Sequence, residues 1–168
     1  RINEHLYNSE IQRVIYKPTP WIYHCYPAEE DLYALINICH AQLMARDISS
    51  TIPFALRMKF TESRRSGIRK ATRAGVTVCE SKDYATFWNI LNDNLTNKYD
   101  THPVHSLEEL ELLHNYFPKS IRLFMAYNNK GIAIGGTVVY EMSQVIHTQY
   151  ISASKEGKKL GALDLLFD

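Results

Sequence analysis

Three histidines are the side chains of this chain best suited to transfer a proton near neutral pH, because imidazole titrates there without assistance. His147 lies within the run VIHTQYISA, and His102 and His105 flank Pro103 in a polar segment between two predicted helices. Loops of that kind carry functional side chains more often than cores do. No cysteine or carboxylate stands at ligand spacing from these histidines, so the sequence predicts no zinc site.

The run around His147 predicts a β-strand, in which side chains alternate between two faces. Alternation places His147 on one face with Gln149 and Ile151. The other face would then carry Thr148, Tyr150 and Ser152. His147 is therefore either a base or substrate contact, or a hydrogen-bonded histidine of the core.

The segment from Ser154 to Gly161 leaves this strand and leads to a helix predicted to begin near Gly161. It contains three lysines and two glycines, namely Lys155, Lys158, Lys159, Gly157 and Gly161. Unpaired amides at a helix start, close backbone approach at glycine and nearby positive charge together favour a bound phosphate. The segment has neither Gly-Lys-Ser/Thr nor Gly-x-Gly-x-x-Gly, so it predicts a pyrophosphate cradle without nucleotide hydrolysis. An ordinary solvated connection is the alternative.

A basic run lies between Lys59 and Arg73, with six basic residues against one acidic residue in a chain of net charge +1. Arg65, Arg69 and Arg73 recur every four residues and would form a stripe on one face of a helix. The stripe predicts attraction of coenzyme phosphates, a tRNA acceptor stem or an acidic partner. A solvated helix face balanced by acidic neighbours is the alternative.

The elements that must hold these residues follow from hydrophobic periodicity and capping signals. Strands are predicted at 11–16, 21–26, 76–80, 121–127, 132–140 and 145–153, the last three as an antiparallel meander, with an extended segment at 52–60. Helices are predicted over 28–46, from Thr61 to Gly75, over 82–97 after a Ser81 cap, and over 107–117 after a Ser106/Glu109 capping box. Helical spacing assigns Tyr84, Phe87, Trp88 and Tyr116 to core packing.

Composition predicts a globular chain of mixed α/β class, with 45% hydrophobic and 22% charged residues. The cysteines, Cys25, Cys39 and Cys79, are odd in number and lie in apolar patterns, which is typical of reduced core thiols in a cytoplasmic protein. No apolar stretch approaches the length of a membrane span. The chain opens on Arg1 and ends at Asp168 directly after an apolar run, so we interpret it as a fragment.

The order helix, strand, two helices, three-stranded meander, glycine/lysine turn and helix resembles the GNAT acyltransferase fold, a central, mostly antiparallel sheet flanked by helices. The segment Lys158-Lys159-Leu160-Gly161-Ala162-Leu163 is similar to that family's Gln/Arg-x-x-Gly-x-Gly/Ala turn, with Lys at the first position and Leu at the last. The segments RRSGIRKATRAGVTV, HPVHSLEELELLHNYFP and HTQYISASKEGKKLGALDLL resemble the FemAB-like branch, whose members contain two GNAT-like halves. The resemblance implies that residues 1–58 end a preceding half, 59–75 form a basic linker helix, and 76–168 begin an incomplete acyltransferase domain.

The resemblance also implies a cofactor, acetyl-coenzyme A or another acyl-coenzyme A, and an amine acceptor that is a small molecule or a peptide. The expected cofactor contacts are Tyr150, Ile151 and Ser152 for the pantetheine arm, and Lys158, Lys159, Gly161 and Ala162 for the pyrophosphate. The expected catalytic residues are His147 and His102, and the expected substrate contacts are His105 and Gln149. Two rivals stay open: an aminoacyltransferase that takes aminoacyl-tRNA through Arg65, Arg69 and Arg73, and a GNAT-like binding module without catalysis.

Overall fold

The computed structural model describes residues 2–168, which divide into two units, residues 2–50 and Thr51–Asp168. The first unit contains helix α1 (Ile2–Asn8), a short 3-10 turn (Trp21–Tyr23) and helix α2 (Glu30–Asn37), and none of its described residues is buried. The strands predicted at 11–16 and 21–26 are wrong, and the helix predicted over 28–46 is reduced to α2. High β-propensity forms no strand where a segment has no partner to pair with, and residues 2–50 contain no strand.

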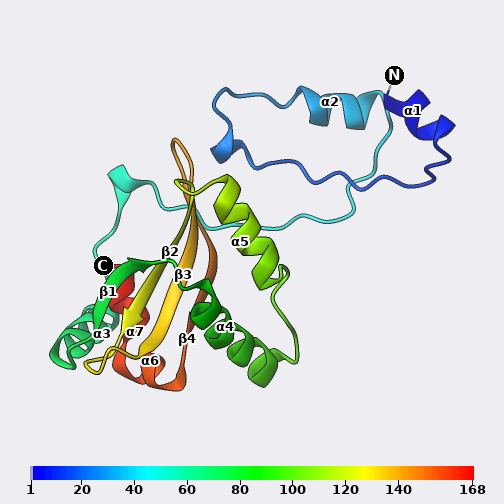
Figure 1. Cartoon of the computed structure of the whole chain (residues 1–168). Coiled ribbons are helices and arrows are strands. Elements are labelled where there is room, and N and C mark those ends of the chain that lie inside the picture. Colours follow the sequence, from blue (N-terminus) through cyan, green and yellow to red (C-terminus); the bar gives the residue numbers. More distant parts are fainter. Residues whose placement is uncertain (1) are drawn as a thin grey trace. The chain divides into compact units, whose positions relative to one another are not determined.

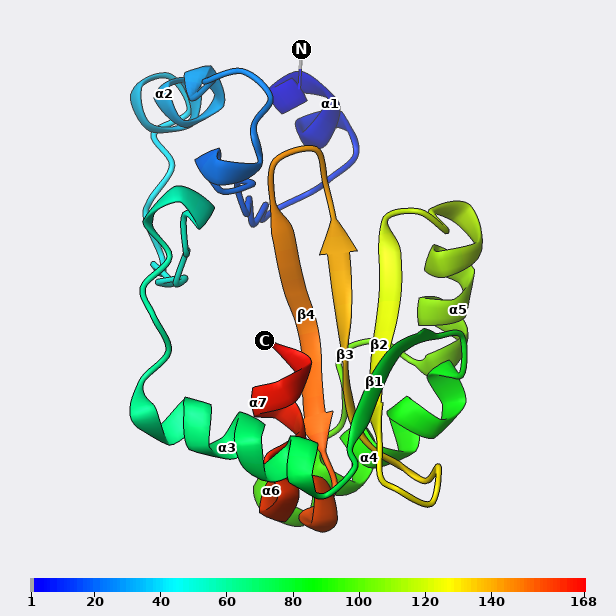
Figure 2. The same cartoon turned by 90° about the vertical axis from the view of Figure 1, so that its left-hand side faces the viewer.

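The second unit is built on one antiparallel sheet of order β1-β2-β3-β4, which Figures 1 and 2 show. The strands are β1 (Thr77–Ser81), β2 (Ile121–Tyr127), β3 (Ala133–Glu141) and β4 (Ile146–Ala153). A 3-10 turn (Phe54–Leu56) precedes the helices, which are α3 (Glu62–Arg73), α4 (Tyr84–Tyr99), α5 (Leu107–Tyr116), α6 (Lys155–Leu160) and α7 (Ala162–Leu166). Helices α4 and α5 cover one face of the sheet, and α3, α6 and α7 lie at the other (Figure 2). The predicted mixed α/β fold, with an antiparallel sheet flanked by helices, is confirmed.

The larger core lies between the sheet and helices α4 and α5. Phe87 of α4 and Leu110 of α5 are fully buried against Leu123, Met125 and Val138 of the strands. The helical spacing of the apolar residues along α4 and α5 is what directs them to this face. The core assignment of Tyr84, Phe87 and Trp88 is therefore confirmed, whereas Tyr116 is 71% exposed at the end of α5 and that assignment was wrong.

The three cysteines were expected in the core, and all three are exposed. Cys25 and Cys39 belong to the unit that buries none of its described residues. Cys79 lies on β1, which pairs with a neighbour on one side alone within the described sheet. An apolar sequence pattern gives burial only where a second layer covers it, and no such layer covers these positions.

The turn that leaves β4 is fixed by two glycines. Gly157 is buried, and a Cβ there would overlap the carbonyl oxygen of Ile134 on β3. Gly161 has φ +78°, and a Cβ there would lie 2.7 Å from the carbonyl oxygen of Gly67 on α3. The α6–α7 corner therefore sits in backbone contact with both β3 and α3, at a closeness that only glycine permits.

Residues 155–160 were predicted as part of a loop, and they form helix α6 instead. Ser154 starts this helix as an N-cap, because its hydroxyl accepts a hydrogen bond from the Gly157 N–H at 3.1 Å. Gly161 ends it in the left-handed conformation that helix C-termini favour. The cap signal lies within the sequence, and the two glycines obscured it.

We predict that Gly157→Ala lowers the free energy of unfolding by about 2–3 kcal/mol, because the added methyl group must displace the β3 backbone. Gly131→Ala is the matched control, since Gly131 has φ +74° but nothing within 4 Å of the added Cβ. It should lose only about 1 kcal/mol from its positive φ. Urea unfolding curves measure both values, and equal losses in the two variants would contradict the close contact.

Candidate functional site

Strand β4 contains a β-bulge at Gln149. Val138 of β3 pairs with Tyr150 and the next residue, Val139, pairs with Thr148, so Gln149 is the extra residue on β4. A bulge of this kind bends a strand and is common beside functional sites. It therefore marks the middle of β4 as the first candidate for a site.

The bulge also changes which side chains share a face of the sheet. His147 lies opposite Tyr140, with ring centroids 6.2 Å apart, on the face that α4 and α5 cover. Tyr150 and Ser152 lie on that same face. The predicted grouping of His147 with Ile151 was wrong, because one extra residue reverses the alternation on one side of the bulge.

The outer edge of β4 is open at Ile151. The Ser154 N–H donates to the carbonyl oxygen of Ile134 at 2.9 Å, which fixes the phase of the β3–β4 ladder. In an antiparallel ladder bonded pairs alternate with non-bonded pairs, so Ala153 and Ile151 direct their backbone groups away from β3. The Ala153 carbonyl accepts from Asn94 at 2.7 Å, whereas the N–H and C=O of Ile151 have no partner among residues 2–168.

Tyr150 and His105 form a hydrogen-bonded pair beside the bulge. The Tyr150 hydroxyl lies 2.5 Å from His105 Nδ1, and the Trp88 ring of α4 packs edge-on against Tyr150 with centroids 5.0 Å apart. His105 directly precedes Ser106, whose capping box with Glu109 fixes the start of α5. Both side chains are half-buried, so this pair of titratable groups is held in place and still reaches solvent.

Asn94 of α4 ties the end of β4 to α6. Its Nδ2 donates to Ser152 Oγ at 2.5 Å as well as to the Ala153 carbonyl, and its Oδ1 accepts from Lys158 Nζ. Asn94 is not among the predicted site residues. The available signal was a polar residue interrupting the apolar stripe between Leu91 and Leu95.

The remaining predicted site residues lie apart from the Tyr150–His105 pair in their contacts. His102 is exposed and bonds Asn92 Oδ1 at 3.1 Å, and His147 bonds Gln149 Oε1 at 3.1 Å. Lys159 is exposed. Ala162 is fully buried under α3, so its side chain is closed to a ligand.

Tyr140, the neighbour of His147, has a buried hydroxyl without a hydrogen-bond partner among the described residues. Burial raises the pKa of this hydroxyl, so it stays protonated in the physiological range.

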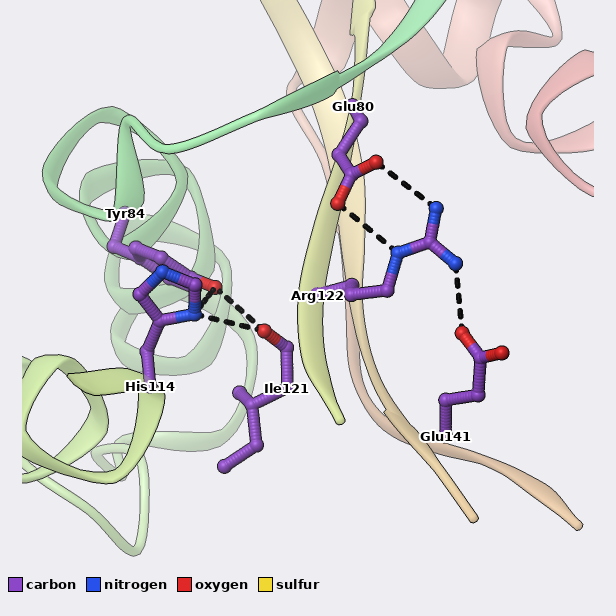
Figure 3. A network of polar contacts seen from close by, with 6 residues as sticks. All are labelled: Glu80, Tyr84, His114, Ile121, Arg122 and Glu141. Carbon is purple, nitrogen blue, oxygen red and sulfur yellow. Dashed lines mark hydrogen bonds and ion pairs between the residues drawn. The ribbon is translucent and has the colours of Figure 1, made fainter. Parts of the chain in front are cut away.

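A second polar cluster lies where β1 and β2 meet the start of α4 and the end of α5 (Figure 3). Glu80, Tyr84, His114 and Arg122 of this cluster line a hollow of about 210 Å³. Arg122 of β2 binds Glu80 with two hydrogen bonds of 3.0 and 2.9 Å, and Glu141 with one of 2.7 Å. Next to it, His114 Nδ1 and the Tyr84 hydroxyl both approach the Ile121 carbonyl, at 2.8 and 3.2 Å. The polar groups of this cluster use one another as hydrogen-bond partners. We therefore interpret the cluster as cross-strand stabilisation rather than a ligand site.

The electrostatics of this cluster agree with a structural role. The hydrogen bonds from Arg122 hold the pKa of Glu80 below its usual range. Burial raises the pKa of Tyr84 to about 12, so its hydroxyl stays protonated at neutral pH.

Within residues 2–168 no group of His, Cys, Asp and Glu side chains is arranged to hold a metal ion. None of the described helices is long and apolar enough to cross a bilayer.

Comparison with known proteins gives similarity to solved structures alone, since no family model and no curated protein matches the chain. It is similar to an acetyltransferase of the GNAT family from Staphylococcus aureus Mu50, with 16% identity over 54% of this chain and 62% of that chain, at a TM-score of 0.41. It is also similar to the spermidine N-acetyltransferase from Vibrio cholerae, solved with CoA and spermine, with 21% identity over 48% and 52% of the chains, at a TM-score of 0.37. The chain spans less than two thirds of either structure.

The Arg122–Glu80 pair predicts a pH dependence of stability. Because the folded-state pKa of Glu80 is lowered, the pair stabilises the fold above the unfolded pKa of about 4.5, and this contribution is lost as the pH falls through the lower folded value. Glu80 is half exposed, so the contribution is at most about 1 kcal/mol. Urea unfolding of wild type and Arg122→Gln should therefore differ most at pH 7 and least near pH 3.

Lys119→Gln is the control, since exposed Lys119 has no carboxylate partner among the described residues. Its difference from wild type should stay constant with pH. A gap between wild type and Arg122→Gln that is equally constant would contradict the assignment.

Proposed function

We propose that this chain is an N-acyltransferase of the GNAT type, which transfers an acyl group from acyl-coenzyme A to an amine. The observation that carries the proposal is the bulged, open edge of β4, which ends at the Ser154-capped turn into α6. An extended ligand rich in amide groups can add to such an edge as another strand would. The pantetheine arm of coenzyme A has this chemistry, with two amides along a flexible chain.

In this proposal Ile151 supplies the backbone contact to the arm, because its N–H and C=O point outward and are unpaired within the described chain. Ser152 is held by Asn94 and by the Ile90 carbonyl, so it shapes the strand from the inner face. The acyl carbonyl would lie near the bulge at Gln149. The pyrophosphate would follow at the α6–α7 corner, near Lys158, Lys159 and Gly161, with Ala162 contributing only backbone.

The chemistry requires an amine nitrogen to attack the thioester carbonyl, after which the carbon–sulfur bond breaks and a thiolate leaves. The amine loses one proton to a base, and the thiolate gains one. We assign the second transfer to the Tyr150 hydroxyl, whose oxygen then regains a proton from solvent through His105, its hydrogen-bond partner at 2.5 Å. His147 and His102 stay as candidate bases for the amine, with His105 and Gln149 near the acceptor.

The FemAB-like alternative, with aminoacyl-tRNA as donor, is less well supported by the charges on α3. Two of the three arginines in its stripe, Arg65 and Arg69, form ion pairs with Glu62. Their charge is therefore partly neutralised before any nucleic acid arrives. The FemAB-like branch itself remains a proposal based on sequence segments.

The direct test combines binding with transfer. Acetyl-coenzyme A at 100 times its dissociation constant should stabilise the fold by about 2.7 kcal/mol, read as a rise in melting temperature. Release of free thiol in the presence of a panel of small amines, amino acids and peptides then reports transfer. Absence of both signals would favour the non-catalytic binding module.

The variant Tyr150→Phe tests the acid. It keeps the ring against Trp88 and removes the hydroxyl, so we expect kcat to fall about 100-fold with acetyl-coenzyme A binding unchanged. Tyr116→Phe is the control, because it removes the hydroxyl of an exposed tyrosine at the end of α5. If both variants kept wild-type kcat, the role of Tyr150 would be wrong.

A further inference from the structure

A groove between α3 and the end of α6 lies outside the site described above. It is a hollow of about 630 Å³, lined on one side by the last turns of α3 and on the other by Leu160. The residues on the α3 side are Ser66, Arg69, Lys70 and Arg73 of α3, followed by Ala74, which caps the end of the helix. The contact between Gly67 and Gly161 holds α3 against the α6–α7 corner, so the groove is part of the packed unit.

The groove carries more positive charge than its surroundings neutralise. Arg69 is paired with Glu62, whereas exposed Lys70 and Arg73 have no acidic partner within residues 2–168, and no acidic residue lines the hollow. Cations in the last turn of a helix are favoured by the helix dipole. That effect explains two basic residues near the end of α3, but it does not require a hollow between them and α6.

The lining selects a class of ligand. Arginine and lysine together bind phosphate oxygens well, arginine through paired N–H groups and lysine as a point charge. Leu160 and Ala74 add apolar surface against which a flat ring can lie. The volume falls within the range of small-molecule sites, about 300–1,000 Å³. A nucleotide with more than one phosphate meets all three conditions.

We propose that the α3–α6 groove binds the phosphorylated adenosine end of the acyl donor. The inference rests on the proposed transfer from acyl-coenzyme A and adds a second contact region to it. Helix α6 leads from the end of β4 to Leu160, and its six residues span about 9 Å. In this proposal the arm of the donor follows the edge of β4 toward Ser154 and its phosphates continue along α6 to the groove at Leu160. Lys70 and Arg73, outside the turn expected to hold the pyrophosphate, become ligand contacts.

The test separates the two ends of the donor. Adenosine 3′,5′-bisphosphate carries phosphates without the arm, and S-acetylpantetheine carries the arm without phosphates. Calorimetric titration of the bisphosphate into wild type should give binding that weakens with added salt. The double variant Lys70→Gln/Arg73→Gln should weaken it at least about tenfold, since one lost charge-assisted hydrogen bond suffices for that change. Binding of S-acetylpantetheine should be the same in both proteins.

The charge-matched control is Lys82→Gln/Lys119→Gln, which removes two exposed lysines at the other end of β1 and β2, outside the groove lining, and should change bisphosphate binding less than twofold. Unchanged urea unfolding of both double variants shows that they fold. Equal weakening in both double variants, or no binding of the bisphosphate to wild type, would overturn the groove assignment. Loss of tRNA binding in the groove variant, with no bisphosphate binding to wild type, would overturn it in favour of RNA. Failure of S-acetylpantetheine alone would count against the proposed transfer and leave the groove standing.

Discussion

The contact of two glycines with neighbouring backbone sets the geometry of everything that follows β4. Gly157 packs against the Ile134 carbonyl, and Gly161 packs against the Gly67 carbonyl. The α6–α7 corner is therefore held between the sheet and α3. A side chain at either position would push the corner outward. Because the corner is fixed, β4 ends at a defined point, and α3 lies close enough to α6 to form a groove with Leu160.

The bulge at Gln149 has a comparable effect within the strand. One extra residue turns His147 to the same face as Tyr150 and Ser152, under α4 and α5. On that face Tyr150 packs against Trp88 of α4 and is hydrogen-bonded to His105, which precedes α5. The unpaired backbone of Ile151 and the Tyr150 end of this hydrogen-bonded pair lie within two residues of the bulge. The middle of β4 therefore combines an open backbone edge with a pair of titratable side chains.

The sequence predicted the antiparallel meander and helices α3 to α5 because their periodicity and caps are local signals. The Ser106–Glu109 capping box is present in both sequence and structure. The predicted strands at 11–16 and 21–26 are wrong because a strand needs a partner that is distant in the sequence. The predicted burial of Cys25, Cys39 and Cys79 is wrong because burial needs a covering layer of structure. His105, Tyr150 and Gln149 were identified as candidates, but the bulge at Gln149, which places His147 on the face of Tyr150, has no signature in the alternation of VIHTQYISA.

The central claim is that the open edge of β4 receives the arm of the acyl donor, and the amide of Ile151 tests it most directly. Hydrogen exchange followed by NMR should find this amide exchanging fast in the free protein, while the Ser152 amide, paired with Gly136, is already protected. Saturating acetyl-coenzyme A should protect Ile151 and leave Ser152 unchanged. An Ile151 amide that exchanges equally fast with and without the donor, or that is protected before it is added, would contradict the account.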